Sequence, residues 1–552
     1  MVSVNSRNQV SSLHRFDYQF VRSKLLNREE IAFLDVREEA PHAEGHPLFA
    51  ANLPLTRLEL DAYRKLPRRD APIVTFDAGE GLAEIAAQRL IALGFTHVGV
   101  FEGGLDGWKD AGGEVFIDVN VPSKAFGELM ESICHTPSIS AQQVRAMIDA
   151  GDDMVIVDVR RFDEYRTMSI PQGVNVPGGE VVLRVPDLAA DPNTLIIVNC
   201  AGRTRSMIGT QSLINAGLPN PVAALRNGTI GWVLAHQQLD VGQSRTSSST
   251  TDESIEIARR RARVVADRSG VKRANKEDLA AWSSQEMRST YFFDVRSISE
   301  YEKNHLADFY PVAGGQLVQE TEMYAPLRGA CIVLVDDDGV RANMAASWLA
   351  QMAWDVYVVD GLTLDDFSQS GSWQAKLPIL PHNSEISPGT LLDWLNSADV
   401  IVVDVAKHAD FKKGHIPGAW YVLRSQLNAA IANLPQASRY VVTSDDGMLA
   451  QLAAAELGQL VEGEVYVLAG GTLAWLEAGN AMESGEKHLA SRPIDRYKRP
   501  YEGTDAKPEA MQAYLDWEFG LIEQLRRDGT HHFQPMKFTG EIFGLKRGSP
   551  LL

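Results

Sequence analysis

Short runs of apolar residues recur along the chain in a fixed order. A run ending in Asp-Val occurs four times, as IAFLDVR, MVIVDVR, TYFFDVR and VIVVDVA, and a second run follows each, as PIVTFD, LIIVNC, CIVLVD and YVVTSD. Apolar runs without alternation are typical of strands buried on both faces of a parallel sheet. Helical patterns such as GLAEIAAQRLIALG and RANMAASWLAQMA come next. This alternation predicts an α/β fold with a doubly wound, mainly parallel sheet.

Three markers keep the same spacing in all four copies of this pattern. The first is the aspartate that ends the first run, at Asp35, Asp158, Asp294 and Asp404. The second run ends 42, 42, 42 and 40 residues later, at Asp77, Cys200, Asp336 and Ser444. A glycine turn lies 69, 70, 67 and 67 residues after the aspartate, at Gly104, Gly228, Gly361 and Gly471. A shared register of this kind indicates domain duplication.

The repeats divide the chain into four predicted domains, and a length of 552 residues agrees with three to four domains. The predicted segments are domain 1 at 10–122, domain 2 at 136–242, a linker and helix at 243–274, domain 3 at 275–376, domain 4 at 384–486 and a C-terminal helical extension at 487–552. The linker opens with the low-complexity stretch QSRTSSSTTDES. The extension contains the helical pattern PEAMQAYLDWEFGLIEQLRR, which we expect to pack on a domain.

Composition excludes several classes of protein. Hydrophobic residues make up 45% and charged residues 23% of the chain, as in ordinary globular proteins. A net charge of -19 argues against broad affinity for nucleic acid or anionic membrane, and no apolar run approaches the roughly 18 residues of a membrane span. Three cysteines without a CxxC pair suit neither a disulfide framework nor a zinc site. We therefore expect a cytoplasmic protein with no metal or organic cofactor.

The candidate catalytic residues cluster around Cys200, in the segment LIIVNCAGRTRSMIGTQSL. A strand pattern ends at the cysteine, and a helical pattern opens near Ser206. A tight loop entering a helix points backbone N–H groups inward and adds a partial positive charge. Arg203 and Arg205 add full charges, and Gly202 tolerates the backbone angles of a tight turn. We therefore expect the pKa of Cys200 to fall well below the free value of about 8.5. Structural roles are favoured for Cys134, between copies one and two, and for Cys331, at a strand start.

These motifs resemble those of the rhodanese family over about residues 15–485. Copy two matches the D-V-R and E-Y motifs of the family at 158–160 and 164–165. Copy four matches its G-H-I-P-G-A motif at 414–419, where copy two departs and reads MSIPQGVNVPGG. The resemblance implies four tandem rhodanese-like domains.

In the rhodanese family the loop cysteine accepts a sulfane sulfur, becomes a persulfide and passes the sulfur on. The resemblance implies that Cys200 is the nucleophile of a thiosulfate sulfurtransferase. The loop residues would hold the persulfide and the donor, the arginines through the donor's oxygens, with support from two residues of the D-V-R motif. These residues are Ala201, Gly202, Arg203, Thr204, Arg205 and Ser206 in the loop, and Asp158 and Arg160 in the motif. The implied partners are a small anionic sulfur donor and an acceptor that is a thiol, cyanide or a sulfur-acceptor protein.

The other three copies lack the cysteine. Asp77, Asp336 and Ser444 stand at its position, and their loops carry acidic residues. An aspartate cannot carry a persulfide and would place negative charge in a loop built for anions, so we expect three inactive domains with remodelled loops. Supporting the active domain by packing is the favoured role for them. Docking an acceptor or closing the mouth of the Cys200 pocket is the alternative.

Two other functions stay open at the level of sequence. The first is a phosphatase or an arsenate reductase. The dual-specificity phosphatases that share the rhodanese fold have five residues between cysteine and arginine, whereas four residues separate Cys200 from Arg205. The shorter loop favours a single sulfur atom over a tetrahedral phosphate. The second alternative is a persulfide carrier or a redox-sensing module that acts on a protein partner, because a reactive thiolate is also prone to oxidation.

Overall fold

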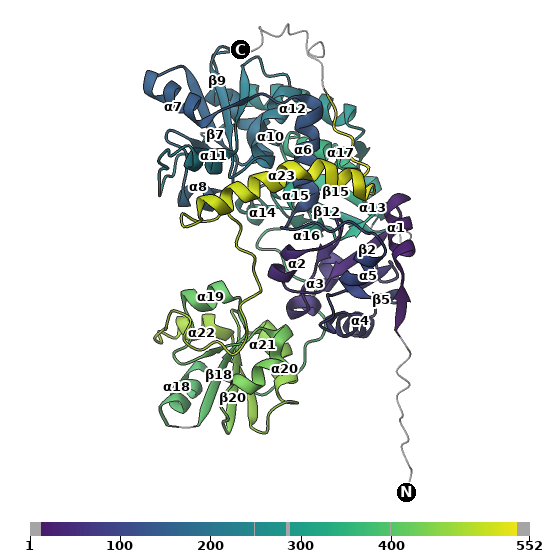
Figure 1. Ribbon diagram of the computed structural model, residues 1–552, viewed down its shortest axis with the longest axis vertical. Coiled ribbons are helices and arrows are strands. Elements are labelled where there is room, and N and C mark those ends of the chain that lie inside the picture. Colours follow the sequence, from purple (N-terminus) through teal and green to yellow (C-terminus); the bar gives the residue numbers. More distant parts are fainter. Residues whose placement is uncertain (1–12, 248, 283–287, 398, 538–552) are drawn as a thin grey trace.

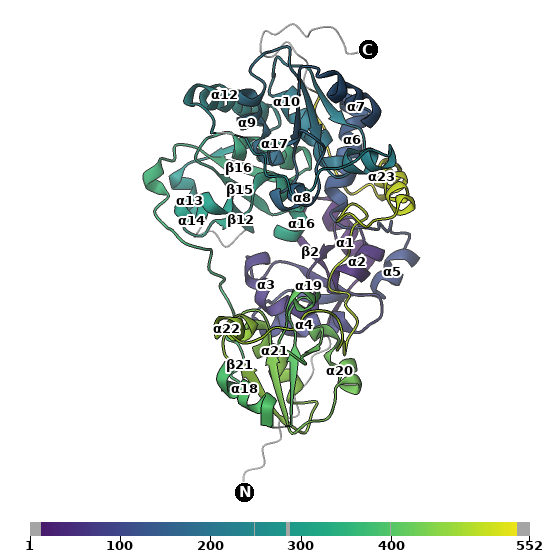
Figure 2. The same cartoon turned by 90° about the vertical axis from the view of Figure 1, so that its left-hand side faces the viewer.

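The computed structural model describes residues 13–247, 249–282, 288–397 and 399–537. Parts of the predicted segments lie outside these ranges: 10–12 in domain 1, 248 in the linker, 283–287 in domain 3, 398 in domain 4 and 538–552 in the extension. The described residues form four sheets, one for each repeat. Domains 1 to 3 gather into one body, and domain 4 stands apart from it (Figures 1 and 2).

Each sheet has its repeat's strands in the same order, with the first strand at one end and a two-residue strand, paired to the strand that ends in the marker aspartate, at the other. The sheet of domain 1 contains β1 (His14–Phe16), β5 (Val98–Phe101), β4 (Ile73–Phe76), β2 (Ile31–Asp35) and β3 (Ala51–Asn52). The sheet of domain 2 contains β6 (Ser138–Ile139), β10 (Val222–Leu225), β9 (Leu195–Asn199), β7 (Met154–Asp158) and β8 (Val174–Asn175).

Domains 3 and 4 repeat this order. The sheet of domain 3 contains β11 (Lys272–Ala274), β16 (Asp355–Val359), β15 (Cys331–Val335), β12 (Thr290–Asp294) and β13 (Tyr310–Pro311). The sheet of domain 4 contains β17 (Glu385–Ile386), β21 (Glu464–Leu468), β20 (Arg439–Thr443), β18 (Val400–Asp404) and β19 (Trp420–Tyr421). All pairings within these twenty strands are parallel, as predicted.

Helices connect the strands as crossovers. Domain 1 has α1 (Tyr18–Leu26), α2 (Glu39–Glu44), α3 (Leu58–Lys65), α4 (Leu82–Ala92) and α5 (Gly104–Asp110). Domain 2 has α7 (Ala141–Ala150), α8 (Phe162–Thr167), α9 (Val181–Leu188), α10 (Thr204–Asn215) and α11 (Gly228–Leu234). Domain 3 has α13 (Lys276–Trp282), α14 (Ile298–Lys303), α15 (Gly314–Gln319), α16 (Thr321–Tyr324) and α17 (Arg341–Gln351). Domain 4 has α18 (Pro388–Ser397), α19 (His408–Lys413), α20 (Leu427–Ala430), α21 (Met448–Leu457) and α22 (Gly471–Glu477).

The apolar runs that mark the repeats form the central strands. Every residue of β2, β9 and β15 is buried, because helices cover both faces of each sheet. Cys331 is the first residue of β15 and belongs to the core, as predicted. The glycine marker starts a helix in domains 1, 2 and 4, but Gly361 of domain 3 does not, and only a short 3-10 turn at Leu364–Asp366 follows it.

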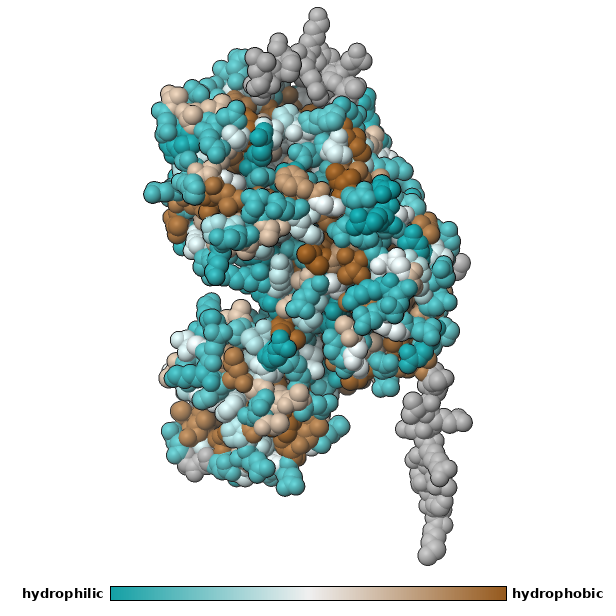
Figure 3. Space-filling model, in the orientation of Figure 1, coloured by the Kyte–Doolittle hydropathy of each residue, from teal (hydrophilic) through white to brown (hydrophobic). Residues whose placement is uncertain are grey.

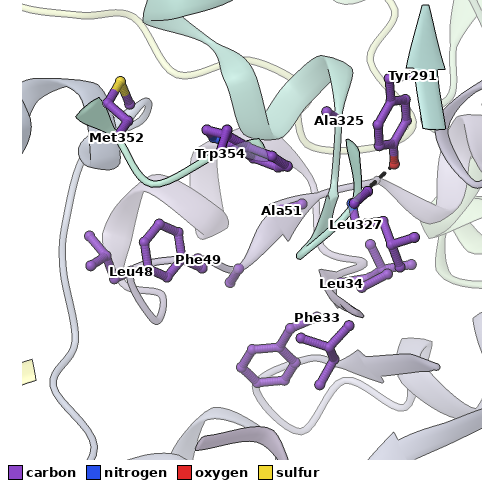
Figure 4. Close-up of a cluster of buried hydrophobic side chains, with 14 of the residues drawn as sticks. Phe33, Leu34, Leu48, Phe49, Ala51, Tyr291, Ala325, Leu327, Met352 and Trp354 are labelled. Carbon is purple, nitrogen blue, oxygen red and sulfur yellow. Dashed lines mark hydrogen bonds between the residues drawn. The ribbon is translucent and has the colours of Figure 1, made fainter. Parts of the chain in front are cut away.

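Domains 1 and 3 share a sheet edge that the sequence does not predict. Strand β14 (Leu327–Arg328) of domain 3 pairs antiparallel with β2 of domain 1. The N–H of Leu327 donates to the hydroxyl of Tyr291 at 3.1 Å, and that hydroxyl donates to the carbonyl of Lys65 at 2.7 Å. Apolar side chains of both domains, including Phe49 and Trp354, pack around this junction (Figure 4). The two domains therefore form one continuous core.

Three further helices connect domains 1, 2 and 3. Helix α12 (Asp252–Arg268) lies in the predicted linker and buries Ala258, Ala262, Val265 and Ala266 between α9 and α17. Helix α6 (Val121–Cys134) joins domains 1 and 2. Helix α23 (Pro508–Asp528), which belongs to the C-terminal extension, packs across α6 (Figure 1). None of the helices in the described part of the chain combines the length and apolar character of a membrane span.

Domain 4 contacts domain 1 through a charged interface. Both terminal nitrogens of Arg424 donate to Glu59, at 2.7 and 2.8 Å, and one donates to the carbonyl of Thr56 at 3.0 Å. Ser425 donates to the buried carboxylate of Glu38 at 2.6 Å. A deep notch separates the rest of domain 4 from the upper body (Figure 3).

Candidate active site

Cys200 lies directly after β9, where the repeat register predicts the end of a strand. Its side chain is 1% exposed, and the thiol donates a hydrogen bond to the Ser206 hydroxyl at 3.3 Å. That hydroxyl donates in turn to the carbonyl of Arg203 at 2.9 Å. Helix α10 begins at Thr204, two residues before the predicted start, because Arg203 already has αR backbone angles. The loop is therefore shorter than the sequence predicts.

Helix α11 holds the back of this loop. The N–H of Thr229 donates to the carbonyl of Cys200 at 2.9 Å, and the N–H of Ile230 donates to the carbonyl of Ala201 at 3.0 Å. Gly228 has a φ of +55°, and a Cβ there would lie 2.3 Å from the Cys200 oxygen. Only a glycine permits this approach, which explains the third repeat marker in domain 2.

Arg205 lies beside Cys200 and is paired with an acid on another helix. Its terminal nitrogens donate to both oxygens of Glu164 in α8, at 2.7 and 2.9 Å. Arg205 holds the pKa of Glu164 at about 2, although burial opposes this. The family motif at 164–165 contains Glu164, but the sequence does not reveal its role. In domain 3, Arg341 pairs with Glu300 in the same way, 41 residues apart in both copies.

Arg203 does not point into the loop. Its guanidinium donates to both oxygens of Glu128 in α6, at 2.8 and 2.9 Å, to Glu131, and to the side chain of Asn227. It also lies 4.3 Å from the ring centre of Phe519. We therefore correct the expected contact between this guanidinium and the donor's oxygens, because the acids of α6 already bind the side chain.

Burial decides the ionisation of Cys200. Removal from water raises the pKa of the thiol, and Glu518 raises it further, whereas Arg205 and the hydroxyl and N–H of Ser206 lower it. The predicted fall of the Cys200 pKa is wrong in this structure. A buried thiolate loses its hydration, and that loss outweighs the nearby positive charge.

Asp158 and Arg160 fix the strand end that precedes Cys200. Arg160 donates from its backbone N–H, its Nε and a terminal nitrogen to the Asp158 carboxylate, and onward to the carbonyl of Met168 at 2.6 Å. The amide of Asn199 donates to Asp158 at 2.9 Å. Since Asn199 adjoins Cys200, this buried network fixes the backbone before Cys200 without a hydrogen bond to its thiol.

Helices α6 and α23 form a roof over the loop. A Cβ on Gly202 would lie 3.2 Å from the ring of Tyr514 and 3.5 Å from Oε2 of Glu518, both in α23. Lys124 of α6 lies 5.1 Å from the ring centre of Tyr514, and a Cβ on Gly127 would meet Thr204 at 2.9 Å. The extension thus packs on domain 2, as expected of its helix, and closes the space above Cys200. Nothing in the sequence identifies which residues it brings there.

The equivalent loop of domain 1 is filled by its own side chain. The Asp77 carboxylate accepts hydrogen bonds from the N–H groups of Gly79, Leu82 and Ala83, at 3.0, 2.6 and 3.0 Å. These residues lie two, five and six positions after Asp77. The backbone N–H groups of this loop therefore donate to the aspartate oxygens of the same loop.

In domains 3 and 4, too, the side chain at the cysteine position accepts hydrogen bonds from backbone N–H groups. Asp336 accepts from the N–H groups of Gly339 and Ala342, at 2.9 and 2.7 Å. The Ser444 hydroxyl accepts from the N–H of Ala450 at 3.3 Å. The described residues contain no group of three or more His, Cys, Asp or Glu side chains arranged to hold a metal ion.

A charged cleft of about 750 Å³ opens next to the Arg205–Glu164 pair. Domains 2, 3 and 4 and the extension line it, at the notch between the two bodies (Figure 3). Its cationic residues include Arg161, Arg205, Lys412, Arg496, Lys498 and Arg499, and its acids include Glu164, Glu320, Asp495 and Glu502. Tyr501 separates the cleft from the roof, since it lines the cleft and also contacts Tyr514.

Comparison with known proteins identifies the family. The rhodanese-like domain family matches residues 22–111, 140–235, 275–361 and 387–478, so all four repeats match. The crystal structure of a thiosulfate sulfurtransferase from Pseudomonas aeruginosa is 58% identical, with a TM-score of 0.93 over 94% of this chain and 99% of that one. The chain therefore belongs to the rhodanese-like family, and the predicted family and fold class are confirmed.

Two curated relatives match only single domains. A putative sulfur carrier protein, YrkF of Bacillus subtilis, is 29% identical over 102 residues, which is 18% of this chain and 54% of the relative. An uncharacterized protein, YibN of Escherichia coli K12, is 30% identical over 95 residues, 16% of this chain and 65% of the relative. The chain thus spans about half to two thirds of the length of these relatives.

Proposed function

We propose that this protein is a sulfurtransferase that moves sulfane sulfur from thiosulfate, or a similar anionic donor, to a thiophilic acceptor through a persulfide on Cys200. The observation that carries the proposal is the occupied loop of domain 1. There a carboxylate binds the N–H groups two, five and six residues beyond the loop's first position. In domain 2 the same offsets fall on Gly202, Arg205 and Ser206, with a small cysteine at the first position. The loop can therefore bind the oxygens of an anion above the thiol.

The reaction follows from this geometry. The Cys200 thiolate attacks the outer sulfur of thiosulfate, the sulfur–sulfur bond of the donor breaks, and sulfite leaves with the bonding electrons. The loop N–H groups and Arg205 stabilise the negative charge that builds up during this step. An acceptor nucleophile then attacks the outer sulfur of the persulfide and restores the Cys200 thiolate. Arg205, fixed by Glu164, marks the side on which an anion approaches from the charged cleft.

The other site residues take lesser roles in this proposal. Ala201, Gly202, Thr204 and Ser206 act through their backbone N–H groups, and Arg203 anchors the loop to α6. Asp158 and Arg160 position the strand end. The nature of the acceptor and the cytoplasmic location stay predictions.

Turnover of thiosulfate and cyanide to thiocyanate tests the proposal. We expect activity in the full chain and its loss in Cys200→Ser. Cys331→Ser is the matched control, because Cys331 is buried in a strand of the silent domain 3. Full activity in Cys200→Ser would overturn the proposal.

A persulfide carrier is the second candidate, supported by the name of one relative. Cys200 is 1% exposed, so delivery to a large partner requires α23 to move. The relative YrkF is named a putative sulfur carrier. A carrier would gain one sulfur at Cys200 but turn over small acceptors no faster than the uncatalysed reaction.

A further inference from the structure

Glu518 is a buried carboxyl group with one free oxygen above the Cys200 loop. It is 1% exposed, and its Oε1 accepts a hydrogen bond from the Tyr514 hydroxyl at 2.8 Å. Its Oε2 is fully buried and has no hydrogen-bond partner among the described residues. This oxygen is the one that lies 3.5 Å from a Cβ placed on Gly202. Buried polar atoms without a partner are rare, so such an atom aimed at a reactive loop calls for an explanation.

The neighbouring carboxylates are already occupied. Both oxygens of Glu164 accept from Arg205, and both oxygens of Glu128 accept from Arg203. With a pKa of about 2, Glu164 is also too weak a base to take a proton from a thiol. Of Glu128, Glu164 and Glu518, only Glu518 keeps a free oxygen, and that oxygen is fully buried. Glu131, the other acid that binds Arg203, is partly exposed to water.

The surroundings of Glu518 make it a better base than an ordinary glutamate. Burial raises the pKa of Glu518 to about 8, and Glu128 raises it as well, whereas Lys124, the Tyr514 hydroxyl and Arg203 lower it. These groups come from α6, α23 and the loop; α11, which also contacts α23, presents only uncharged residues. Tyr501 and Asp118 face Lys124 and Tyr514 from the other side.

Glu518 also lies close enough to Cys200 to affect the ionisation of its thiol. The negative charge of Glu518 raises the pKa of the Cys200 thiol, and burial raises both values. In one dry pocket two negative charges oppose each other, so the doubly ionised pair is disfavoured. With a pKa of about 8, Glu518 carries its own proton in most molecules at neutral pH and can accept one from the thiol once the pH rises past about 8. The thiol cannot pass this proton to Ser206, because a hydroxyl is not a base at neutral pH and Ser206 already donates to Arg203.

We propose that Glu518 accepts the proton of the Cys200 thiol when the sulfur donor enters the loop, directly or through one water molecule. This inference rests on the proposed sulfurtransferase function. The S–H bond of Cys200 breaks, an O–H bond forms on Oε2, and the thiolate attacks the sulfane sulfur while sulfite leaves. When the acceptor removes the outer sulfur, the Cys200 sulfur keeps the electron pair and Glu518 returns the proton. The roof thereby supplies a catalytic group that domain 2 lacks.

The test compares Glu518→Gln with Asp516→Asn. Both changes remove one carboxylate from α23, but Asp516 is exposed and bonded only to Gln512 on the same helix. Persulfide formation is followed by acid quench and intact mass after mixing the full chain with thiosulfate above pH 8, where Glu518 is ionised. We expect Glu518→Gln to slow this step about 100-fold, the usual size of a general-base contribution, and Asp516→Asn to react like the wild type.

A second readout separates this role from a purely electrostatic one. Alkylation of Cys200 by iodoacetamide across pH reports the pKa of the thiol and needs no sulfur transfer. Glu518→Gln removes a negative charge and should lower that pKa, so electrostatics alone would speed persulfide formation. The proposal expects a lower thiol pKa together with slower persulfide formation. Persulfide formation at the wild-type rate or faster in Glu518→Gln would overturn it.

Two controls keep the result clear. Glu518→Asp retains the carboxyl group and should keep at least about a tenth of the wild-type rate; a loss as large as that of Glu518→Gln would count against proton transfer. If circular dichroism shows that Glu518→Gln does not fold, Glu518→Asp takes its place as the test variant. Failure of the wild type to form any persulfide would overturn the proposed function instead, while the alkylation profile would still show whether Glu518 and Cys200 are coupled.

Discussion

Replacing Gly228 with alanine probes how tightly α11 holds the active loop. A Cβ at Gly228 would lie 2.3 Å from the Cys200 oxygen, 2.7 Å from the Gly202 oxygen and 2.9 Å from the Ala201 carbonyl carbon. All three atoms are backbone, so no side chain can rotate away. The loop must retreat by more than half an ångström to reach even the shortest contacts that real Cβ atoms show.

The magnitude follows from two costs. A non-glycine residue in the left-handed region costs about 1–2 kcal/mol, and forcing a methyl group into a packed site costs about 1–3 kcal/mol. We expect Gly228→Ala to lower the free energy of unfolding by about 2–5 kcal/mol. A displacement approaching 1 Å at the nucleophile should lower the rate of sulfur transfer about 100-fold.

Gly471→Ala in domain 4 is a matched control. Gly471 has a φ of +65°, and a Cβ there would lie 2.2 Å from the Ser444 oxygen, so the clash is the same but the loop has no cysteine. Thermal unfolding and thiocyanate formation are measured for both variants. We expect similar destabilisation in both and loss of activity only in Gly228→Ala. Equal activity in the two variants would refute the argument that the loop's backbone position governs catalysis.

Three other changes test separate parts of the account. In Asp404, burial raises the pKa to about 7, since Ala406 replaces the arginine of the D-V-R motif, so the folded state holds a proton that the unfolded state releases near pH 4. Stability should fall as pH rises between these values, and Asp404→Asn should add about 4 kcal/mol in urea unfolding above pH 7 and almost nothing near pH 4; equal effects at both would contradict this. Asp77→Ala should destabilise the chain by about 2 kcal/mol, because three backbone N–H groups lose their acceptor, without slowing sulfur transfer; an unchanged melting temperature would argue against the filled loop. Glu164→Gln should cost about 2 kcal/mol and lower activity, because Arg205 loses its charged partner; activity at the wild-type level would show that the pair does not position Arg205.

The repeat register predicts the framework of the site because it records backbone geometry. Strand ends and loop positions recur with the spacing of the apolar runs, so Cys200, Asp77 and their counterparts fall where the structure has them. The same register does not record which way a side chain turns. Arg203 binds Glu128, 75 residues earlier in the chain, and only the packing of α6 decides this.

The roof is beyond the reach of sequence patterns for a related reason. The apolar periodicity of α23 predicts a packed helix, but one helical face can be matched by many surfaces. In the sequence, nothing distinguishes Glu518 from the other polar residues of that helix. Only tertiary packing places it over Gly202. The pKa of Cys200 could not be predicted either, since the sequence shows the positive charges around the thiol but not its burial.

The central claim is that Cys200 carries sulfur. Intact mass spectrometry of the full chain after incubation with thiosulfate and removal of excess donor tests it most directly. We expect a gain of one sulfur atom, located on the peptide that contains Cys200 and removed by cyanide. No added sulfur, or sulfur on Cys134 or Cys331 instead, would contradict it.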